Sequence, residues 1–272
     1  MMVDVHETAF VTSTFRSFNE ELSGDPFSRL WNNKKTDKWI QSYLSAVSQE
    51  EPLTHCVRNR YFLDQIRQLH GNNKVQVLIN FGCGFSMYPF LFPEEMVHIE
   101  IDKPEIVEHK QNQINQWYSQ GLLPKREIHY ISADFNSEFE QDVLSKIKNL
   151  TNDSSSFILI EGVLFFLNAS KTAKLFNLFS LSQNKGDYIG SVSYDATVLK
   201  TPVFKRLKDF FHQQRIENLE CQVVEDSFYQ HLPEYKLLNK ENYFTLSTVY
   251  NYQPESSVDD ILKENFYILQ KK

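Results

Sequence analysis

The feature that most constrains this chain is a glycine turn between two apolar segments. Val75–Phe81 is a short apolar run and predicts a buried strand. Gly82-Cys83-Gly84 follows at once, where the backbone can turn sharply and let a ligand come close. A second apolar strand, Met96–Ile101, contains Glu100 and leads to Asp102. This order of strand, turn, strand and acid is typical of a nucleoside-binding α/β fold, in which the acid accepts hydrogen bonds from ribose hydroxyls.

The spacing of the glycines narrows the class of ligand. A single residue separates Gly82 from Gly84, and Ser86 or Met87 stands where a dinucleotide-binding turn has its third glycine. That glycine permits close helix packing beneath a pyrophosphate, so its loss argues against a nucleotide-dependent dehydrogenase. A ligand with a ribose but no pyrophosphate fits better, and S-adenosylmethionine is the commonest such cofactor. The turn alone is a weak signal, because many structural loops contain two glycines.

The composition argues against several classes of protein. A chain of 272 residues is long enough to bury a substantial core. Its net charge of −7 argues against a nucleic-acid-binding surface. No apolar run approaches the ~18 residues of a membrane span, and the N-terminus lacks the pattern of a signal peptide. The three cysteines have no metal-ligand spacing, so we expect reduced thiols, no bound metal and a cytoplasmic location.

Residues 1–70 are predicted to form helices that pack on the sheet following them. Apolar residues recur at helical spacing within 15–22, 39–47 and 58–69. Gly24-Asp25-Pro26 ends the first of these stripes. No part of this region alternates like a strand.

From Val75 to Tyr194 the chain alternates between short apolar runs and helical segments. Alternation of this kind predicts a parallel sheet with helices on both faces. Ligand-binding groups are then expected at the carboxyl ends of the strands. The predicted strands are 75–81, 97–101, 127–131, 157–160 and 188–194. The predicted helices between them are 87–91, 104–119, 138–150 and 170–182.

The pattern is less regular after Pro202. Apolar spacing over 204–211 predicts a helix, and segments 223–229, 243–252 and 266–270 are predicted as strands of an antiparallel edge. There is no internal repeat and no low-complexity linker, so we predict one domain. Its expected parts are a helical N-terminal cap (1–70), a cofactor-binding core (75–195) and a substrate-side region (200–272).

Acidic residues recur where the predicted strands end. Asp102 follows the second strand, Asp134 the third and Glu161 the fourth. In a methyl-donor site the first acid can hold the ribose and Asp134 can accept from the adenine amino group. Glu161 can hold the donor's ammonium or receive a substrate proton. The alternative is that these acids cap the helices that follow, since side-chain acceptors are common at helix N-termini.

Five segments in order resemble the leucine carboxyl methyltransferase family, which includes polyketide O-methyltransferases: VLINFGCG, HIEIDKPEIVEHK, YISADF, IEGVLFFL and SVSYD. The family shows a G-x-G turn, E-x-D followed by a proline and a lysine, an acid after the third strand, and E-x-V-L-x-x-L at the fourth. The matching residues are Gly82, Gly84, Glu100, Asp102, Pro104, Lys110, Asp134 and Glu161–Leu167. Thr8-Ala9, Arg16 and Asp25-Pro26 match its N-terminal part, so the resemblance covers roughly residues 5–210.

The resemblance implies an α/β class I methyltransferase, with a Rossmann-like, mostly parallel sheet, an N-terminal helical extension and an antiparallel edge. It implies S-adenosylmethionine as cofactor and methyl transfer to a carboxylate or hydroxyl oxygen of a small-molecule acceptor. Carried over to this sequence, Gly82 approaches the donor within the turn that Gly84 completes. Asp102, with Glu100 beside it, holds the ribose.

The resemblance also assigns the remaining donor contacts. It places Asp134 and Phe135 beside the adenine and Glu161 at the amino-acid end of the donor. A basic residue before the first strand contacts the donor carboxylate in this family. The candidates here are Arg58, which matches best, Arg60 and, less well, Arg16.

The sequence departs from the family pattern within the glycine turn. Many members have an aspartate two residues after the second glycine and an arginine a few residues later. Ser86 stands at the first position, and Tyr88 or Leu91 at the second. This departure leaves an alternative function, that of a non-catalytic or degenerate protein that binds S-adenosylmethionine or S-adenosylhomocysteine.

The need for a catalytic base depends on the acceptor. A carboxylate needs none, because it is ionised at pH 7. A hydroxyl needs one, and Tyr194 and Asp195 match an aromatic-acid pair of the family near the expected substrate. His212 and His231 are further candidates, although a lone histidine is more often a surface residue. Cys83 is interpreted as a small filler residue, because no partner cysteine or histidine accompanies it.

Overall fold

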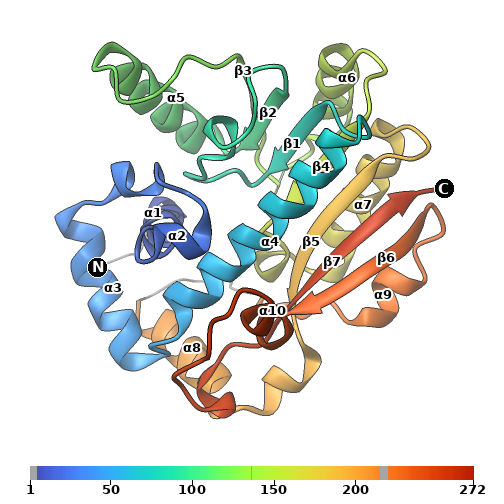
Figure 1. The fold of residues 1–272 in the computed structure, drawn as a ribbon. Coiled ribbons are helices and arrows are strands. Elements are labelled where there is room, and N and C mark those ends of the chain that lie inside the picture. Colours follow the sequence, from blue (N-terminus) through green and yellow to red (C-terminus); the bar gives the residue numbers. More distant parts are fainter. Residues whose placement is uncertain (1–4, 136, 215–219) are drawn as a thin grey trace.

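The computed structural model describes residues 5–135, 137–214 and 220–272, which are built around a seven-stranded sheet (Figure 1). The strands are β1 (Val77–Phe81), β2 (Val97–Asp102), β3 (Ile128–Ser132), β4 (Ser156–Ile160), β5 (Tyr188–Tyr194), β6 (Tyr235–Asn242) and β7 (Glu264–Lys271). Their order is β3-β2-β1-β4-β5-β7-β6. The first five are parallel, and β7 pairs antiparallel with β5 and β6. The predicted α/β class, with a parallel sheet and an antiparallel edge, is confirmed.

The helices follow the predicted positions over most of the chain. They are α1 (Val5–Ser17), α2 (Glu20–Ser23), α3 (Lys34–Ala46), α4 (Glu51–Gly71), α5 (Pro104–Ser119), α6 (Glu140–Thr151), α7 (Ala169–Ser182), α8 (Pro202–Gln213), α9 (Asp226–Gln230) and α10 (Tyr243–Val249). The helix predicted at 87–91 is only a single 3-10 turn, Tyr88–Phe90. Within the described ranges, no helix combines the length and the apolar character that crossing a bilayer requires.

The strand order reverses at β1, which places the ends of three strands together. β2 and β3 lie on one side of β1, and β4 and β5 lie on the other. Phe81 of β1 is level with Ile101 of β2 and with Ile160 of β4. The glycine turn begins directly after Phe81, so it lies at this common edge. Ligands of open α/β sheets bind in the crevice at such a reversal.

The core lies on both faces of the sheet. In β4, Ile158 and Ile160 pack with α6 and α7, whereas Phe157 and Leu159 pack with α4. Successive side chains of a strand point to opposite faces, which produces this division. The helices α1, α2 and α3 lie together beside α4 at one side of the sheet (Figure 1). The prediction of N-terminal helices packed against the core is therefore confirmed.

The C-terminal part differs from the prediction in three places. Segments 223–229 and 243–252 contain α9 and α10, so the prediction of strands there is wrong. At the start of α10, the Asn242 side chain accepts the Thr245 N–H at 3.0 Å and the Thr245 hydroxyl accepts the Asn242 N–H, a capping box that starts a helix. The strand β6 is absent from the prediction because it is a polar edge strand, and polar side chains protect such edges from further pairing.

Candidate functional site

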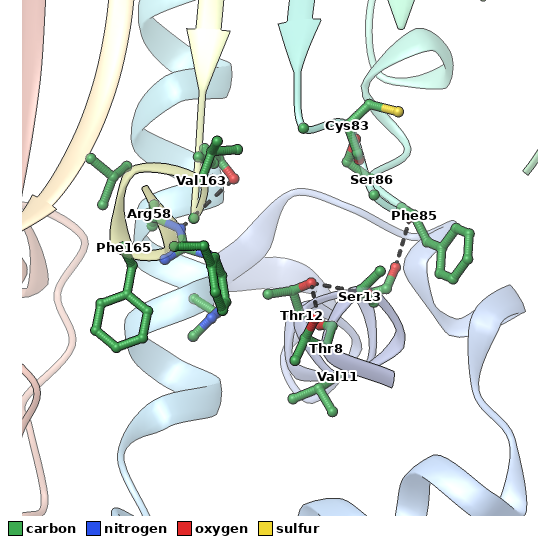
Figure 2. A pocket seen from close by; sticks show the side chains of 18 of the residues that line it. Thr8, Val11, Thr12, Ser13, Arg58, Cys83, Phe85, Ser86, Val163 and Phe165 are labelled. Atoms are coloured by element: carbon green, nitrogen blue, oxygen red, sulfur yellow. Dashed lines mark hydrogen bonds and ion pairs between the residues drawn. The ribbon is translucent and has the colours of Figure 1, made fainter. Parts of the chain in front are cut away.

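A cavity of about 700 Å³ lies at the carboxyl ends of the parallel strands. Its lining comes from the segments that follow β1, β2, β3 and β4, from the end of β5 and from the helices α1, α3, α4 and α8. Figure 2 shows Thr8, Thr12 and Ser13 of α1 near the turn that contains Cys83 and Ser86. The predicted cofactor-binding core and the N-terminal helices therefore meet at this cavity.

The glycine turn forms one wall of the cavity. Gly82 and Gly84 have φ angles of +70° and +45°, in the left-handed region that favours glycine. A Cβ atom on Gly82 would lie 2.1 Å from Cγ2 of Val163, so no side chain fits there. The N–H groups of Gly82 and Cys83 donate to the Ile101 carbonyl at 2.8 and 3.1 Å and hold the turn against β2. The backbone itself lines the cavity at this wall, which lets a ligand approach closely.

The two acids at the end of β2 have different surroundings. Asp102 lines the cavity, and its carboxylate accepts the N–H groups of Gly84 and Lys103, both at 2.8 Å. Burial raises the pKa of Asp102, and these backbone hydrogen bonds oppose the rise. Glu100 is 1% exposed, lies outside the cavity lining and forms an ion pair with Lys110. Asp102 therefore faces the cavity, whereas Glu100 does not.

Ser86 supports the turn in place of the acid of the family pattern. Asn80 of β1 donates through Nδ2 to Ser86 Oγ at 2.9 Å, and Ser86 Oγ donates to the Cys83 carbonyl at 2.8 Å. The same Asn80 amide lies 3.4 Å from Glu100. A neutral hydroxyl thus ties the turn to β1, and the buried Lys110–Glu100 pair lies behind it.

Glu161, directly after β4, is the centre of a buried charged cluster. Its carboxylate accepts from Arg16 of α1 and, at 2.5 Å, from the Tyr88 hydroxyl. Nε of Arg58 on α4 lies 3.7 Å from Glu161, and its Nη1 donates to Glu264 of β7 at 2.7 Å. The cluster therefore joins both ends of the described chain to the carboxyl edge of the sheet.

The cluster keeps Arg58 charged and leaves several polar atoms without a hydrogen bond. Burial by itself lowers the pKa of Arg58, but the charges of Glu264 and Glu161 outweigh it, so the pKa is raised. Arg16 Nε, Arg58 Nε and Glu264 Oε2 are buried and have no hydrogen-bond partner within the described ranges. Such an unpaired group costs about 1–3 kcal/mol. Guanidinium donors beside carboxylate acceptors fit the carboxylate and ammonium of an amino acid, as at one end of S-adenosylmethionine.

The structure separates the three candidate arginines. Arg58 and Arg16 line the cavity, whereas Arg60 does not. Arg60 pairs with Asp64 one helical turn later on α4, with Nε 2.9 Å from Oδ2, and both side chains are more than one third exposed. Arg58 is therefore the arginine of α4 that is placed for a ligand, as the resemblance implies.

Phe135 and Asp134 lie at the edge of the cavity, after β3. Phe135 lines the cavity and packs against Phe81, with ring centroids 6.1 Å apart. Asp134 lies outside the lining, and its backbone carbonyl accepts the Ser137 N–H at 2.9 Å. The position of Phe135 in the lining agrees with its predicted place beside the adenine. Both this contact and the role of Asp134 stay predictions.

The two residues predicted as a possible base, Tyr194 and Asp195, have different positions: one lines the cavity and the other caps a turn. Tyr194 lines the cavity and packs edge to face on Phe165, with centroids 5.3 Å apart. Asp195 lies outside the lining and accepts from the Thr197 N–H at 2.9 Å and from Asn265 at 3.2 Å. Burial raises the pKa of Asp195, but these hydrogen bonds outweigh it and lower the pKa. Its position is that of a turn cap, which does not support the predicted role as a base.

The other sequence candidates for a base or nucleophile lie elsewhere or are inert. His212 and His231 are exposed and lie outside the cavity lining. Cys83 is buried, and burial raises the pKa of its thiol well above the usual value, so it stays protonated. This agrees with the interpretation of Cys83 as a filler residue.

Several cavity residues are absent from the sequence prediction. Tyr43 of α3 donates to Glu51 at 3.0 Å, and His55 follows one turn later on α4. Glu264 comes from the last described strand. The helical spacing of this region indicates α3 and α4, but it does not show which of their polar residues face a cavity. Their only sequence signal is a group of polar residues beside Pro52 at the start of α4.

Comparison with known proteins identifies the family and the fold. Residues 10–180 match the family model described as leucine carboxyl methyltransferase. Among curated protein sequences, none matches the chain. A crystal structure from Thermobifida fusca, provisionally named as a methyltransferase, is 12% identical with a TM-score of 0.65, covering 96% of this chain and 94% of that one.

Two further structures have the same fold. A DUF574 family protein from Streptomyces avermitilis is 11% identical with a TM-score of 0.65 and covers 97% of each chain. A protein from Anabaena variabilis described as an S-adenosylmethionine-dependent methyltransferase is 12% identical with a TM-score of 0.53, covering 89% of this chain and 96% of that one. At these identities the likeness concerns the fold, and it confirms the predicted class I methyltransferase architecture.

Proposed function

This chain belongs to the leucine carboxyl methyltransferase family, and we propose that it transfers a methyl group from S-adenosylmethionine to a carboxylate or hydroxyl oxygen of a small molecule. The family and the fold are those of methyltransferases that use this donor. The observation that carries the proposal is one cavity that joins the glycine turn, Asp102 and the charged cluster around Glu161 to an aromatic chamber.

The residues at the carboxyl ends of β1 to β3 fit the nucleoside part of the donor. Gly82 brings bare backbone to the cavity wall, at a position where a Cβ atom would overlap with Val163. Asp102, oriented by the Gly84 N–H at 2.8 Å, presents a carboxylate that would accept from the ribose hydroxyls. The Phe135 ring would cover the adenine, since an aromatic face stacks on a base.

The charged cluster fits the amino-acid part of the donor. Arg58 and Arg16 each keep a buried Nε that has no hydrogen-bond partner among residues 5–135, 137–214 and 220–272. These donors would bind the carboxylate of the donor, and Glu161 would accept from its ammonium. Arg58 is the stronger candidate because Glu264 fixes its position. Its Nη1 donates to the Glu264 carboxylate at 2.7 Å.

The protein's own contribution to the reaction is alignment and exclusion of water. The bound donor supplies an activated methyl group on a sulfonium, so no covalent intermediate with the protein is needed. The cavity walls would align an acceptor oxygen with that methyl group, which would lower the entropic barrier. The helix α1 closes over the glycine turn through Ser13, whose Oγ donates to the Phe85 carbonyl at 2.9 Å. Exclusion of water by the bound donor and acceptor would keep it from competing with the acceptor.

The loop geometry favours an active enzyme over a degenerate binding protein. The reason for the alternative is Ser86, which replaces the acid of the family pattern. Ser86 is hydrogen-bonded to both Asn80 and Cys83, so the turn does not lack support. Asp102, Arg58 and Glu161 line the same cavity. Donor binding without turnover of any acceptor would restore the alternative.

The proposal is tested by calorimetric titration of S-adenosylmethionine and S-adenosylhomocysteine into three proteins. Wild type should bind both. Asp102→Asn should weaken binding about tenfold or more, because it removes hydrogen bonds to a charged acceptor, worth about 1.5–3 kcal/mol. Asp142→Ala is the matched control, since this exposed carboxylate pairs only with Lys146 on α6. Failure of wild type to bind either compound, or equal affinity of the Asp102 variant, would overturn the proposal.

A further inference from the structure

The cavity continues beyond the charged cluster into a chamber with aromatic walls. Trp39 and Tyr43 of α3, Phe165 after β4, Tyr194 of β5 and Phe211 of α8 line it, and we call this part the acceptor chamber. Trp39 stacks on Tyr43 with centroids 5.2 Å apart, and Phe165 packs edge to face on Tyr194. Flat aromatic surfaces of this kind fit a planar, largely apolar ring.

Most polar groups of the acceptor chamber hold a proton at neutral pH. Burial, and next the charge of Glu264, raise the pKa of Glu51 to about 8, so its carboxyl is mostly protonated at pH 7. Burial also raises the pKa of Tyr194 and of Tyr43 well above the usual value. The Tyr43 hydroxyl is already engaged, because it donates to Glu51 at 3.0 Å. These groups are therefore poor acceptors for a substrate proton.

His55 is the exception, and its hydrogen bond fixes its tautomer. Its Nδ1 lies 2.9 Å from the Glu51 carbonyl oxygen, one turn earlier in α4. A carbonyl oxygen only accepts, so Nδ1 carries the hydrogen and Nε2 of the neutral ring has a free lone pair. Burial, and next the charge of Arg58, hold the pKa of His55 well below 6.5, which keeps the ring neutral.

The ring is also placed where a substrate can reach it. His55 is 8% exposed and lines the cavity, and Phe15 packs edge to face against it with centroids 5.1 Å apart. Because the Nδ1 edge of the ring is bound to the helix backbone, the Nε2 edge is the one available to the chamber. The charged and titratable groups around it are Arg16 of α1, Tyr43 of α3, Glu51 and Arg58 of α4, Tyr194 of β5 and Glu264 of β7.

We propose that His55 Nε2 accepts the proton of a phenolic hydroxyl, so that the methyl acceptor is an aromatic alcohol rather than a carboxylate. This inference rests on the proposed methyltransferase function. The O–H bond breaks and its proton passes to Nε2. The oxygen forms a bond to the sulfonium methyl carbon, and the carbon–sulfur bond breaks with its electron pair going to sulfur. The imidazolium of His55 then returns the proton to solvent.

A carboxylate acceptor would not use this arrangement. It is already ionised at pH 7 and has no proton to transfer. Its negative oxygen would face the lone pair of Nε2, which repels it. The cations nearest to His55 are Arg58 and Arg16, which pair with Glu264 and Glu161 and whose remaining donors are assigned above to the carboxylate of the methyl donor. A neutral hydroxyl is the group that can donate a hydrogen bond to Nε2.

Two substitutions of His55 separate proton transfer from positioning. His55→Phe keeps a flat ring and removes the acceptor, whereas His55→Gln keeps a hydrogen-bond acceptor that is no base at pH 7. His70→Phe is the matched control, because its Nδ1 makes the same kind of bond, 2.9 Å from the Val75 carbonyl, outside the cavity lining. Each protein is assayed with radiolabelled S-adenosylmethionine against phenols of graded acidity and against the corresponding benzoates.

Wild type and His70→Phe should methylate the phenols. His55→Phe should lose about 100-fold or more on weakly acidic phenols at pH 7, as expected for loss of a general base, and far less on a phenol that is already ionised. Its rate should rise tenfold per pH unit as the phenol ionises, whereas that of wild type changes little. His55→Gln should keep the KM of wild type and lose kcat.

Calorimetry with S-adenosylhomocysteine distinguishes failure of the proposed methyltransferase function from failure of the proposed role of His55. All four proteins should bind it equally. A wild type that does not bind it would overturn the proposed function, and the role of His55 with it. A wild type that binds it but methylates only benzoates, or neither series, would overturn the role of His55 alone, as would a His55→Phe variant with unchanged rates on every phenol.

Discussion

The donor end of the cavity and the acceptor chamber are built in different ways. At the donor end, Gly82 directly follows β1, Asp102 is the last residue of β2 and Phe135 lies shortly after β3, so the register of the sheet places them. The acceptor chamber is formed by side chains of α3, α4 and α8 together with Phe165 after β4 and Tyr194 of β5, which come from widely separated parts of the chain. Local backbone geometry thus fixes the donor end, whereas the docking of distant elements fixes the chamber. The same sheet can therefore keep one donor while helix packing changes the acceptor.

The largest effect is expected where the two ends meet, at Arg58. Arg58→Met leaves Glu264 and Glu161 buried beside Arg16 alone, and breaking a buried ion pair from one side costs about 3–5 kcal/mol. Urea unfolding should show this loss. Arg60→Met, two residues away in the same helix, removes only a partly exposed pair and should cost under about 1 kcal/mol. Similar small losses for both would mean that the cluster does not hold the two ends together.

A smaller effect, confined to the donor end, is expected from Gly82→Ala. The new Cβ would overlap with Val163 at 2.1 Å in a left-handed conformation, so the free energy of unfolding should fall by about 2–4 kcal/mol. Gly121→Ala is the control, because Gly121 has the same φ of +70° and a Cβ added there would meet no atom within 4 Å. It should cost about 1–2 kcal/mol. Calorimetry should show weaker donor binding only for Gly82→Ala, and equal losses in stability for both would exclude the overlap with Val163.

A further effect is a pH dependence located in the acceptor chamber. Burial first, and then Glu264, raise the pKa of Glu51 from 4.5 to about 8, so between these values the folded protein holds a proton that the unfolded chain has lost. Glu51 therefore lowers stability as the pH rises through this window, by up to about 1.4 kcal/mol per unit. Glu51→Gln should flatten that slope in urea unfolding between pH 5 and 8.

Glu105→Gln provides the reference for this pH series. Glu105 is exposed in the first turn of α5, far from the chamber in sequence. Its substitution should leave the slope of wild type unchanged. If Glu51→Gln also leaves it unchanged, the carboxyl of Glu51 is ionised in the folded protein and the chamber is more polar than its aromatic walls indicate.

Features that depend on neighbouring residues could be predicted from the sequence. Five apolar runs indicated the parallel strands, and the two glycines at 82 and 84 indicated the turn, because its conformation depends on the backbone of those residues alone. Acids after strands were a weaker guide. Asp102 faces the cavity, whereas Asp195 caps the turn that follows β5 and Glu100 pairs with Lys110. One pattern therefore has three outcomes, which packing decides.

Features that depend on contacts between distant segments could not be predicted. The apolar spacing of residues 58–69 indicates α4 but not how the helix is rotated against the sheet, and this rotation decides that Arg58 is buried and Arg60 exposed. His55 and Glu51 reach the chamber for the same reason. Glu264 belongs to a strand whose neighbour β6 is polar, and no local pattern connects it with an arginine 206 positions earlier.

The position of β7 also has a consequence for the order in which the molecule is assembled. β7 is the last described strand, yet it lies between β5 and β6 and supplies Glu264 to Arg58. A growing chain emerges with its N-terminal part first, so β6 leaves the ribosome before the strand that must separate it from β5. Every donor-end residue is then already synthesised, while the guanidinium of Arg58 still lacks this carboxylate. Closure of the sheet and pairing of Arg58 with Glu264 therefore both wait for the synthesis of β7.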